Sequence, residues 1–369
     1  MTYEKADLHN SIMGDRDLSG WRPSRAELRR RRRRRNRGRW FIGGLVMLLL
    51  LAVLIPYGYY RSQVGGGSSK ISVSVSASPG EGLGQFAGVL ASKGVIGSSL
   101  MFRIWLRTQS PVVLQAGTYK FKRDDPYSHI LATLEKGPVL DRLVIPDGLT
   151  LAQIAAKVGK LPHHSAAHFL QVASSGQVRS PFEPSSVNSL EGLLYPDTYS
   201  FDPSTSDKNI LQMMVDAFVT QAFKLGLTPQ TKSGTLSAYQ IVILASIVEK
   251  EAIYPGDANK VARVILNRLS RNMKLQLDST VFYALGNTST RLSLADLQVK
   301  SPYNTYLITG LPPTPISLPS ESALQAALNP ASGSWLYYVV VEKNGAEAFS
   351  TTYAGQLANE KLASSRGLG

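Results

Sequence analysis

The segment that most constrains this chain is Trp40–Tyr60, which is almost wholly apolar. An α-helix rises about 1.5 Å per residue, so roughly twenty residues cover the ~30 Å hydrocarbon layer of a bilayer. Trp40 at one end and Tyr57, Tyr59 and Tyr60 at the other lie where membrane proteins carry aromatic belts. The segment therefore predicts a transmembrane helix over residues 40–60, which divides the rest of the chain between the two sides of a membrane.

A block of arginines before this segment predicts its orientation. Residues 1–39 contain 13 Lys and Arg against five Asp and Glu, and Arg29–Arg35 is an unbroken arginine run. Because positively charged flanks stay in the cytoplasm, we expect a single-pass protein of the cell (inner) membrane. Its N-terminus would be cytoplasmic and the part after residue 60 extracytoplasmic. A cleaved signal peptide is the alternative, but no small-x-small cleavage site follows the apolar run.

The charge of the chain is concentrated in this tail. The net charge is +14, of which residues 1–39 carry +8, and these residues include few large apolar side chains. We expect the tail to be disordered and the rest of the chain to be mildly basic, which suits an anionic polymer as partner. An arginine run can bind nucleic acid, but directly before a span it is better explained by contact with anionic lipid. We therefore expect no nucleic-acid partner.

The chain has no cysteine, which excludes a disulfide framework, a thiolate metal site and a cysteine nucleophile. Histidines His163, His164 and His168 resemble a zinc pattern, since the last two are one helical turn apart. No Glu follows His164 in the arrangement that pairs two ligands with a base, and no acidic cluster is near in sequence. We expect surface histidines, no metal site and no cofactor.

After the span, the sequence predicts an α+β protein that begins with a flexible linker over 61–70. A small α+β unit is expected at 71–140. Alternating residues over 71–75 and 112–121 indicate its strands, and amphipathic stretches over 84–93 and 127–136 indicate its helices.

A second unit is predicted at 141–187. It begins with a strand over 142–145 and a Pro146-Asp-Gly148 turn, followed by a helix that Thr150 can cap. A strand, a glycine turn and then Thr-x-x-x-Ile-Ala is the order found in LysM-type carbohydrate modules. Most units of this composition bind no sugar, so sugar binding is a hypothesis here.

The remaining residues, 188–369, form the predicted catalytic domain, centred on the apolar run Ile241–Ala252. Ser237 and Gln240 form a capping box that predicts a helix buried nearly all round, although the many β-branched residues leave a strand as the alternative. The run ends on Glu249, and a carboxyl group beside a core holds its proton more tightly. The alternative is a structural carboxylate paired with Lys250 or Arg263.

Polar and aromatic residues follow this helix. Asp257 is expected to cap a helix over 258–271, and residues 273–280 are expected to form an extended rim that presents Gln276 and Asp278. Residues 303–306 and 310–313 combine aromatic rings and amides with rigid prolines. Such groups commonly stack on sugars and bind their hydroxyls.

This block resembles the YceG-like endolytic murein transglycosylases of bacteria. The resemblance covers about residues 41–355, and the matching segments, in the family's order, are Leu190–Tyr199, Ala245–Glu251, Asn267–Leu269, Leu275–Asp278, Ser301–Tyr306, Gly310–Pro313 and Asn329–Pro330. The chain departs from the family pattern at Glu347 and Gln356, where histidines are common, and at Ser279 and Thr314.

The resemblance implies that Glu249 is the catalytic acid. It implies a membrane-anchored lyase that cuts the MurNAc–GlcNAc bond of nascent peptidoglycan, leaves a 1,6-anhydro end and so limits strand elongation. On this reading Gln276, Asp278, Asn304 and Tyr306 position the sugar, within a loop that includes Tyr303. Glu191 would orient Glu249 or the N-acetyl group.

Two alternatives remain at this point. One is a water-using muramidase in which Glu191 or Asp278 is the second carboxylate. The other is a non-catalytic tether that binds the wall through the LysM-like module. The expected partners are peptidoglycan strands and the membrane; contact with peptidoglycan synthesis enzymes is a further hypothesis.

Overall fold

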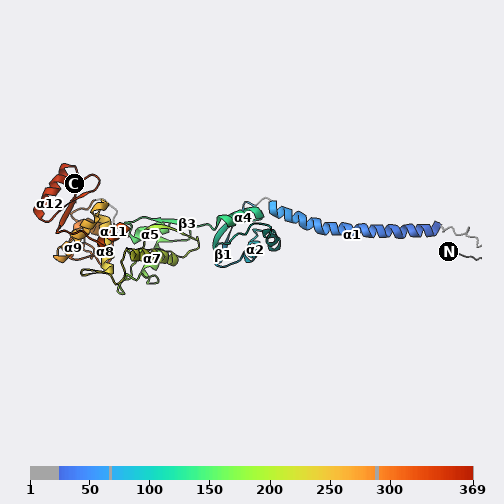
Figure 1. Ribbon diagram of the computed structural model, residues 1–369, viewed down its shortest axis with the longest axis horizontal. Coiled ribbons are helices and arrows are strands. Elements are labelled where there is room, and N and C mark those ends of the chain that lie inside the picture. The colour runs from blue at the N-terminus through green and yellow to red at the C-terminus, as the bar shows by residue number, and fades with distance from the viewer. Residues whose placement is uncertain (1–24, 66–68, 287–290, 369) are drawn as a thin grey trace, which may run out of the picture. The chain divides into compact units, whose positions relative to one another are not determined.

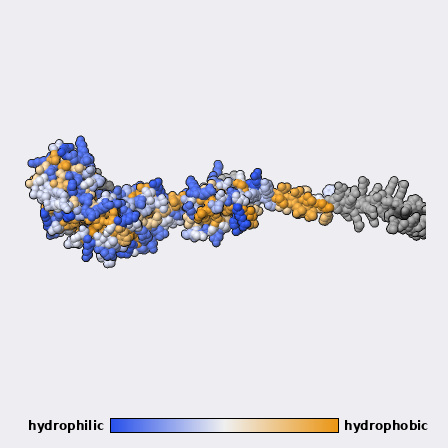
Figure 2. All heavy atoms as spheres, in the orientation of Figure 1, coloured by the Kyte–Doolittle hydropathy of each residue, from blue (hydrophilic) through white to orange (hydrophobic). Residues whose placement is uncertain are grey.

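The computed structural model describes residues 25–65, 69–286 and 291–368, with side chains from residue 40 onward. Its first element is α1 (Arg25–Gly65), whose stretch Trp40–Gly65 is largely apolar and has no buried side chain (Figures 1 and 2). By length and composition this stretch can cross a membrane. The helix is longer than the predicted 40–60, since it takes in residues 25–39 of the expected disordered tail and 61–65 of the expected linker. Residues 1–24 lie outside the described part.

The chain divides into two compact units, the first of which includes α1. The first contains the helices α2 (Leu83–Ser92), α3 (Ser99–Leu106) and α4 (Tyr127–Lys136). Two strands, β1 (Ser72–Ala77) and β2 (Gly117–Lys122), pair in a sheet whose residues are shared between the units. The predicted helices are confirmed, whereas the second strand begins at residue 117 and not at 112.

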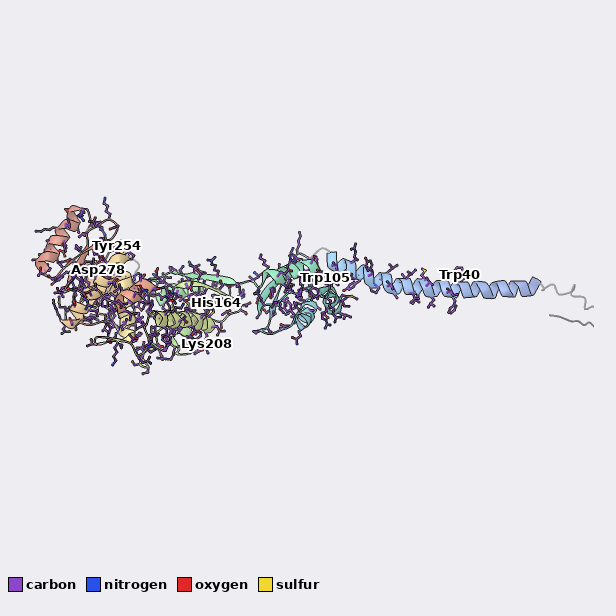
Figure 3. The ribbon with its side chains drawn as sticks, in the orientation of Figure 1. Trp40, Trp105, His164, Lys208, Tyr254 and Asp278 are labelled. Carbon is purple, nitrogen blue, oxygen red and sulfur yellow. The ribbon has the colours of Figure 1, made fainter. Side chains whose placement is uncertain are left out.

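The core of the first unit is aromatic. Phe102 packs edge-on against Tyr127 with ring centroids 5.0 Å apart, and Trp105 lies beside both (Figure 3). Phe86 of α2 lies 6.4 Å from Phe121, ring centre to ring centre. Aromatic pairs of this kind contribute about 0.5–1.5 kcal/mol beyond the area they bury.

The second unit contains two paired strands that are far apart in the sequence. β3 (Asp141–Ile145) pairs antiparallel with β4 (Asp197–Phe201), and between them the chain forms α5 (Leu151–Val158) and α6 (Ala166–Ser174). The long helix α7 (Asp207–Lys224) completes the core. Thr150 caps α5 with a capping box, as predicted. β4 and α7, which complete this core, lie beyond residue 187. The predicted unit at 141–187 therefore lacks the strand that pairs with β3 and the helix that packs against α6.

His164 corrects the prediction of surface histidines. Its side chain is only 4% exposed, and its Nδ1 lies 2.5 Å from Oδ1 of Asp207, the first residue of α7. His168 lies 2.5 Å from the other oxygen of Asp207 but is 62% exposed, as expected for a surface residue. No carboxylate is close to His164 in sequence, whereas the fold brings one from 43 residues away.

The second half of this unit is built around α8 (Ala238–Glu251). The helix prediction is confirmed: Ser237 and Gln240 form the capping box, and every residue from Ala238 to Val248 except Gln240 is buried. The other elements of this half are β5 (Lys232–Ser233), β6 (Leu236–Ser237), α9 (Ala258–Ser270), α10 (Asp278–Leu285), α11 (Glu321–Leu328), β7 (Tyr337–Val340), β8 (Glu347–Ser350), α12 (Tyr353–Ser365) and two short 3₁₀ turns at Pro255–Asp257 and Asp296–Gln298.

Two local predictions in this half were wrong. Asp257 stands before α9 but does not cap it, because its carboxylate accepts the Glu347 N–H and a Lys260 hydrogen bond instead. The extended rim ends at Leu277, and Asp278 begins α10. At Asp257 the carboxylate binds a residue distant in the sequence and not the start of α9. At Asp278 the helix begins where the alternating pattern predicted extended chain.

The segment 316–320 positions the functional site. Ser246 of α8 holds it on one side, by accepting the Ile316 N–H and by offering its carbonyl to the Ser317 hydroxyl, both at 3.0 Å. On the other side, Leu318 exchanges backbone hydrogen bonds of 2.8 Å with Gly148 and Leu149. The segment therefore fixes the turn after β3 against the end of α8.

Candidate functional site

Glu249 lies in the last turn of α8, half-buried at the edge of the core. Its Oε2 accepts a 2.9 Å hydrogen bond from the backbone N–H of Ser320, the residue that caps α11. Burial raises the pKa of Glu249, the Ser320 hydrogen bonds lower it, the charge of Asp147 raises it, and Lys250 lowers it; the net direction is upward. An upward shift of the pKa favours the protonated form, which is the form that a general acid needs.

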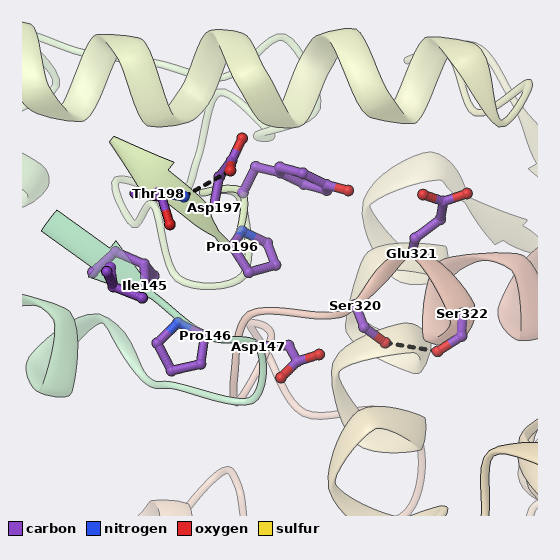
Figure 4. A pocket seen from close by; sticks show the side chains of 11 residues that line it. Ile145, Pro146, Asp147, Pro196, Asp197, Thr198, Ser320, Glu321 and Ser322 are labelled. Atoms are coloured by element: carbon purple, nitrogen blue, oxygen red, sulfur yellow. Dashed lines mark hydrogen bonds between the residues drawn. The ribbon is translucent and has the colours of Figure 1, made fainter. Parts of the chain in front are cut away.

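A cleft of about 470 Å³ lies beside this group (Figure 4). Ser320, whose N–H binds Glu249, is one of its lining residues, so Glu249 is one hydrogen bond away from the wall of the cleft and does not itself line it. The walls of the cleft are formed by the end of β3 with the turn that follows it, the start of β4 and the start of α11. The lining residues are Val144, Ile145, Pro146, Asp147, Tyr195, Pro196, Asp197, Thr198, Ser320, Glu321 and Ser322. None of these described lining side chains is basic.

Three of the predicted site residues lie close together in the structure: Gln276, Asp278 and Tyr306. They lie on the side of Glu251, the second acid of the Glu249–Glu251 pair. Tyr306 donates to Asp278 at 2.6 Å, and the Gln276 N–H donates to the Thr305 carbonyl. Ser279, next in the chain, donates to Glu251 at 2.5 Å. This group is therefore linked to Glu251 through Ser279, whereas Glu249 is bound to Ser320.

Two other predicted residues hold loops together. The Asn304 side chain is fully buried, and its amide donates to the carbonyls of Leu297 and Val299. The Tyr303 hydroxyl lies 2.8 Å from that of Thr314, and its ring lies 4.8 Å from that of Tyr283. The Asn304 amide is thus occupied inside the loop, whereas Tyr303 remains partly exposed.

Glu191 is buried, with 4% of its surface exposed. One carboxylate oxygen accepts the N–H of Leu151 at the start of α5, and the other accepts the hydroxyl of Tyr283 in α10. Burial raises the pKa of Glu191 to about 7 despite these hydrogen bonds. The residue ties the start of α5 to α10, and both its oxygens already have partners.

A second group of carboxyls gathers around Glu251. The Tyr338 hydroxyl donates to Glu251 at 2.8 Å, and Glu347 lies nearby with a buried oxygen that has no hydrogen-bond partner. Burial, helped by the charges of Asp257 and Glu251, raises the pKa of Glu347 to about 8. No group of three or more His, Asp or Glu side chains within residues 40–65, 69–286 and 291–368 is arranged to hold a metal ion.

Glu347 should make stability fall as the pH rises. Its pKa is about 8 when folded and near 4.5 when unfolded, so between these values folding retains a proton that the unfolded chain releases. Each unit of difference corresponds to about 1.4 kcal/mol. We expect Glu347→Gln to flatten the fall in Tm between pH 5 and pH 8. Calorimetry of both proteins across that range checks this, and parallel curves for the two would contradict it.

The cleft residues Asp147, Asp197, Ser320 and Glu321 were not among the predicted site residues. The available signal was the Pro146-Asp-Gly148 turn, read above only as a turn. Nothing local in the sequence connects this turn to Glu249, because Lys250 and Gly148, which contact each other, are 102 residues apart.

Comparison with known proteins identifies the family. The model of the YceG-like family matches residues 75–362, most of the chain. The chain belongs to the YceG-like family. A relative from Bacillus subtilis (strain 168), named endolytic murein transglycosylase, is 30% identical over 315 residues, which cover 81% of this chain and 87% of the relative.

Two further similarities agree with this assignment. A protein of the same name from Streptococcus pneumoniae serotype 2 is 30% identical over 79% of this chain, which spans only 60% of that relative's length. The crystal structure of a YceG-like protein from Listeria monocytogenes is similar with a TM-score of 0.54 and 32% identity, covering 79% of this chain and 99% of the other.

Proposed function

We propose that this YceG-like protein is a membrane-anchored endolytic murein transglycosylase with Glu249 as its catalytic acid. The observation that carries the assignment is a carboxyl group with a raised pKa that is held by the N–H of Ser320, a residue that lines a cleft. The names of the Bacillus and Streptococcus relatives support the reaction class. The substrate is the glycan of peptidoglycan, cut between MurNAc and GlcNAc.

The reaction needs one group that first gives and then takes a proton. Protonated Glu249 donates to the glycosidic oxygen as the bond from C1 of MurNAc to that oxygen breaks. The resulting carboxylate takes the proton of the MurNAc 6-hydroxyl, whose oxygen forms the new bond to C1. The product is a 1,6-anhydro end, no water is consumed, and Glu249 returns to its protonated form.

The supporting residues divide between two regions in this proposal. Ser320 orients Glu249, and Thr198 and Tyr195 offer a hydroxyl and a ring inside the cleft. Murein is a polymer, so Gln276, Asp278, Tyr303 and Tyr306 are proposed contacts for the strand where it continues past Glu251. Glu191 and Asn304 are assigned the role of holding this scaffold together.

Residues 40–65 anchor the enzyme in the cell membrane with residues 1–39 in the cytoplasm. The arginine-rich flank supports this orientation. The LysM-like module would help to hold the glycan, and the cut would limit elongation of nascent strands close to the bilayer.

Product analysis tests the reaction. Detergent-solubilised full-length protein is incubated with uncrosslinked glycan strands, and the new ends are identified by mass spectrometry. Lytic cleavage predicts products that sum to the mass of the substrate, with 1,6-anhydro ends. Products heavier by one water per cut would establish a muramidase instead, and binding without any cleavage would establish a tether.

A further inference from the structure

The turn after β3 lies directly against the proposed catalytic acid. Gly148 adopts φ of +68°, and a Cβ placed on it would lie 3.7 Å from Oε1 of Glu249. The turn is fixed from two sides: the Gly148 N–H donates to the Leu318 carbonyl at 2.8 Å, and Lys250 donates to the Gly148 carbonyl at 3.3 Å. A left-handed glycine held in this way brings the backbone, and with it the preceding residue, close to Glu249.

That preceding residue is Asp147, whose carboxylate is exposed and lines the cleft next to Ser320 (Figure 4). Around Glu249, the charged neighbours are Asp147 from the turn and Lys250 from α8. Glu321 of α11 and Asp197 of β4 also line the cleft. Among these acids, Asp147 is the one whose charge contributes to the raised pKa of Glu249, and it belongs to the predicted module at 141–187.

We propose that Asp147 is a second functional carboxylate of this site, supplied by the 141–187 module, and that it acts through Glu249. The inference rests on the proposed function and goes beyond it, since it makes the module part of the catalytic machinery and not only a holder of glycan. Asp147 forms no bond during the reaction. It is a positioning residue in the electrostatic sense, because its charge keeps the proton on Glu249.

The chemistry explains why such a charge is useful. A single acid must remain protonated until the substrate enters, and a nearby negative charge favours the neutral form of a carboxyl group. The raised pKa of Glu249, to which Asp147 contributes, agrees with this. The same charge faces a sugar whose C1 becomes positive as the glycosidic bond breaks, and it therefore stabilises the transition state.

The pH dependence of cleavage tests the proposal in full-length, detergent-solubilised protein. Asp147→Asn removes the charge at nearly constant shape, and Asp147→Glu keeps it. Asp216→Asn is the matched control, since Asp216 is an exposed carboxylate on α7 that is bonded to Gln212 and does not line the cleft. Rates and KM for glycan strands are measured from about pH 4 to pH 9, with Tm measured alongside.

We expect Asp147→Asn to lower kcat by roughly tenfold, with a smaller change in KM, and to move the basic limb of the rate profile to lower pH. The shift has this sign because losing the negative charge lowers the pKa of Glu249. Asp147→Glu should keep the limb near its wild-type position, and the control should match the wild type.

An unchanged basic limb and kcat in Asp147→Asn would overturn the inference, as would an effect on KM alone. If the Asn variant loses thermal stability, Asp147→Ser removes the same charge with a smaller side chain and is judged by the same limb. Failure of the proposed function is seen separately, as the absence of anhydro ends from the wild-type protein.

Discussion

Glu249→Gln is expected to lower the rate of anhydro-end release by about 10²–10⁴-fold, the usual contribution of general acid–base catalysis. The glutamine oxygen can still accept the Ser320 N–H, so the local geometry should persist, but the amide cannot donate a proton to the glycosidic oxygen. Since burial already disfavours the charged form of Glu249, the neutral variant should keep the wild-type Tm.

The adjacent acid provides a matched comparison. Glu251 has a similar apolar helix behind it, but its carboxylate is occupied by the hydroxyls of Ser279 and Tyr338. We expect Glu251→Gln to lose much less activity than Glu249→Gln when anhydro ends are counted by chromatography under identical conditions. If Glu249→Gln cleaves at the wild-type rate, or the order of the two variants is reversed, Glu249 is not the acid.

The largest expected effect on stability is at Gly192, next to Glu191. Its φ is +72°, and a Cβ there would lie 2.3 Å from Cβ of Pro315 and 3.1 Å from the Ser317 carbonyl oxygen. Neither a proline ring nor this backbone can move easily, because Ser317 is bonded to Ser246. We expect Gly192→Ala to lower the free energy of unfolding by about 2–5 kcal/mol, from backbone strain and overpacking together.

Gly226→Ala separates these two causes. Gly226 follows α7 with φ of +80°, and a Cβ there would meet no atom within 4 Å. This variant should show the backbone strain alone, about 1–2 kcal/mol. Chemical denaturation followed by circular dichroism measures both; equal losses for the two glycines would mean that the contact with Pro315 is relaxed and contributes nothing.

The sequence was most informative where its signals are local. The capping box of Ser237 and Gln240 with the apolar run behind it predicted α8, and Thr150 predicted the start of α5. Both were correct because a helix forms hydrogen bonds between residues three and four apart, and side chains near its start satisfy its first N–H groups. The apolar stretch after the arginines predicted a transmembrane helix, and the structure has a helix there that is long and apolar enough to cross a membrane.

The sequence was least informative where distant segments meet. No residue close to His164 in the sequence indicated its contact with Asp207, and none close to Asp257 indicated its contact with Glu347. The strand that pairs with β3 lies outside the predicted unit at 141–187. The contact of Tyr306 with Asp278, and that of Ser279 with Glu251, likewise join residues 28 positions apart. Each of these pairings depends on tertiary packing, which a spacing pattern does not encode.

The sequence by itself therefore determined the elements: a span-length apolar helix, a buried helix that ends on two acids, and the family motifs around them. Only the tertiary structure decided which acid is bound by a residue of the cleft and which is bound by two hydroxyls. It also decided that a turn 102 residues away brings Asp147 to Glu249. The physical reason is that the proton affinity of a carboxyl group depends on the water it loses and the charges it faces, and both are set by packing and not by the residue's neighbours in the chain.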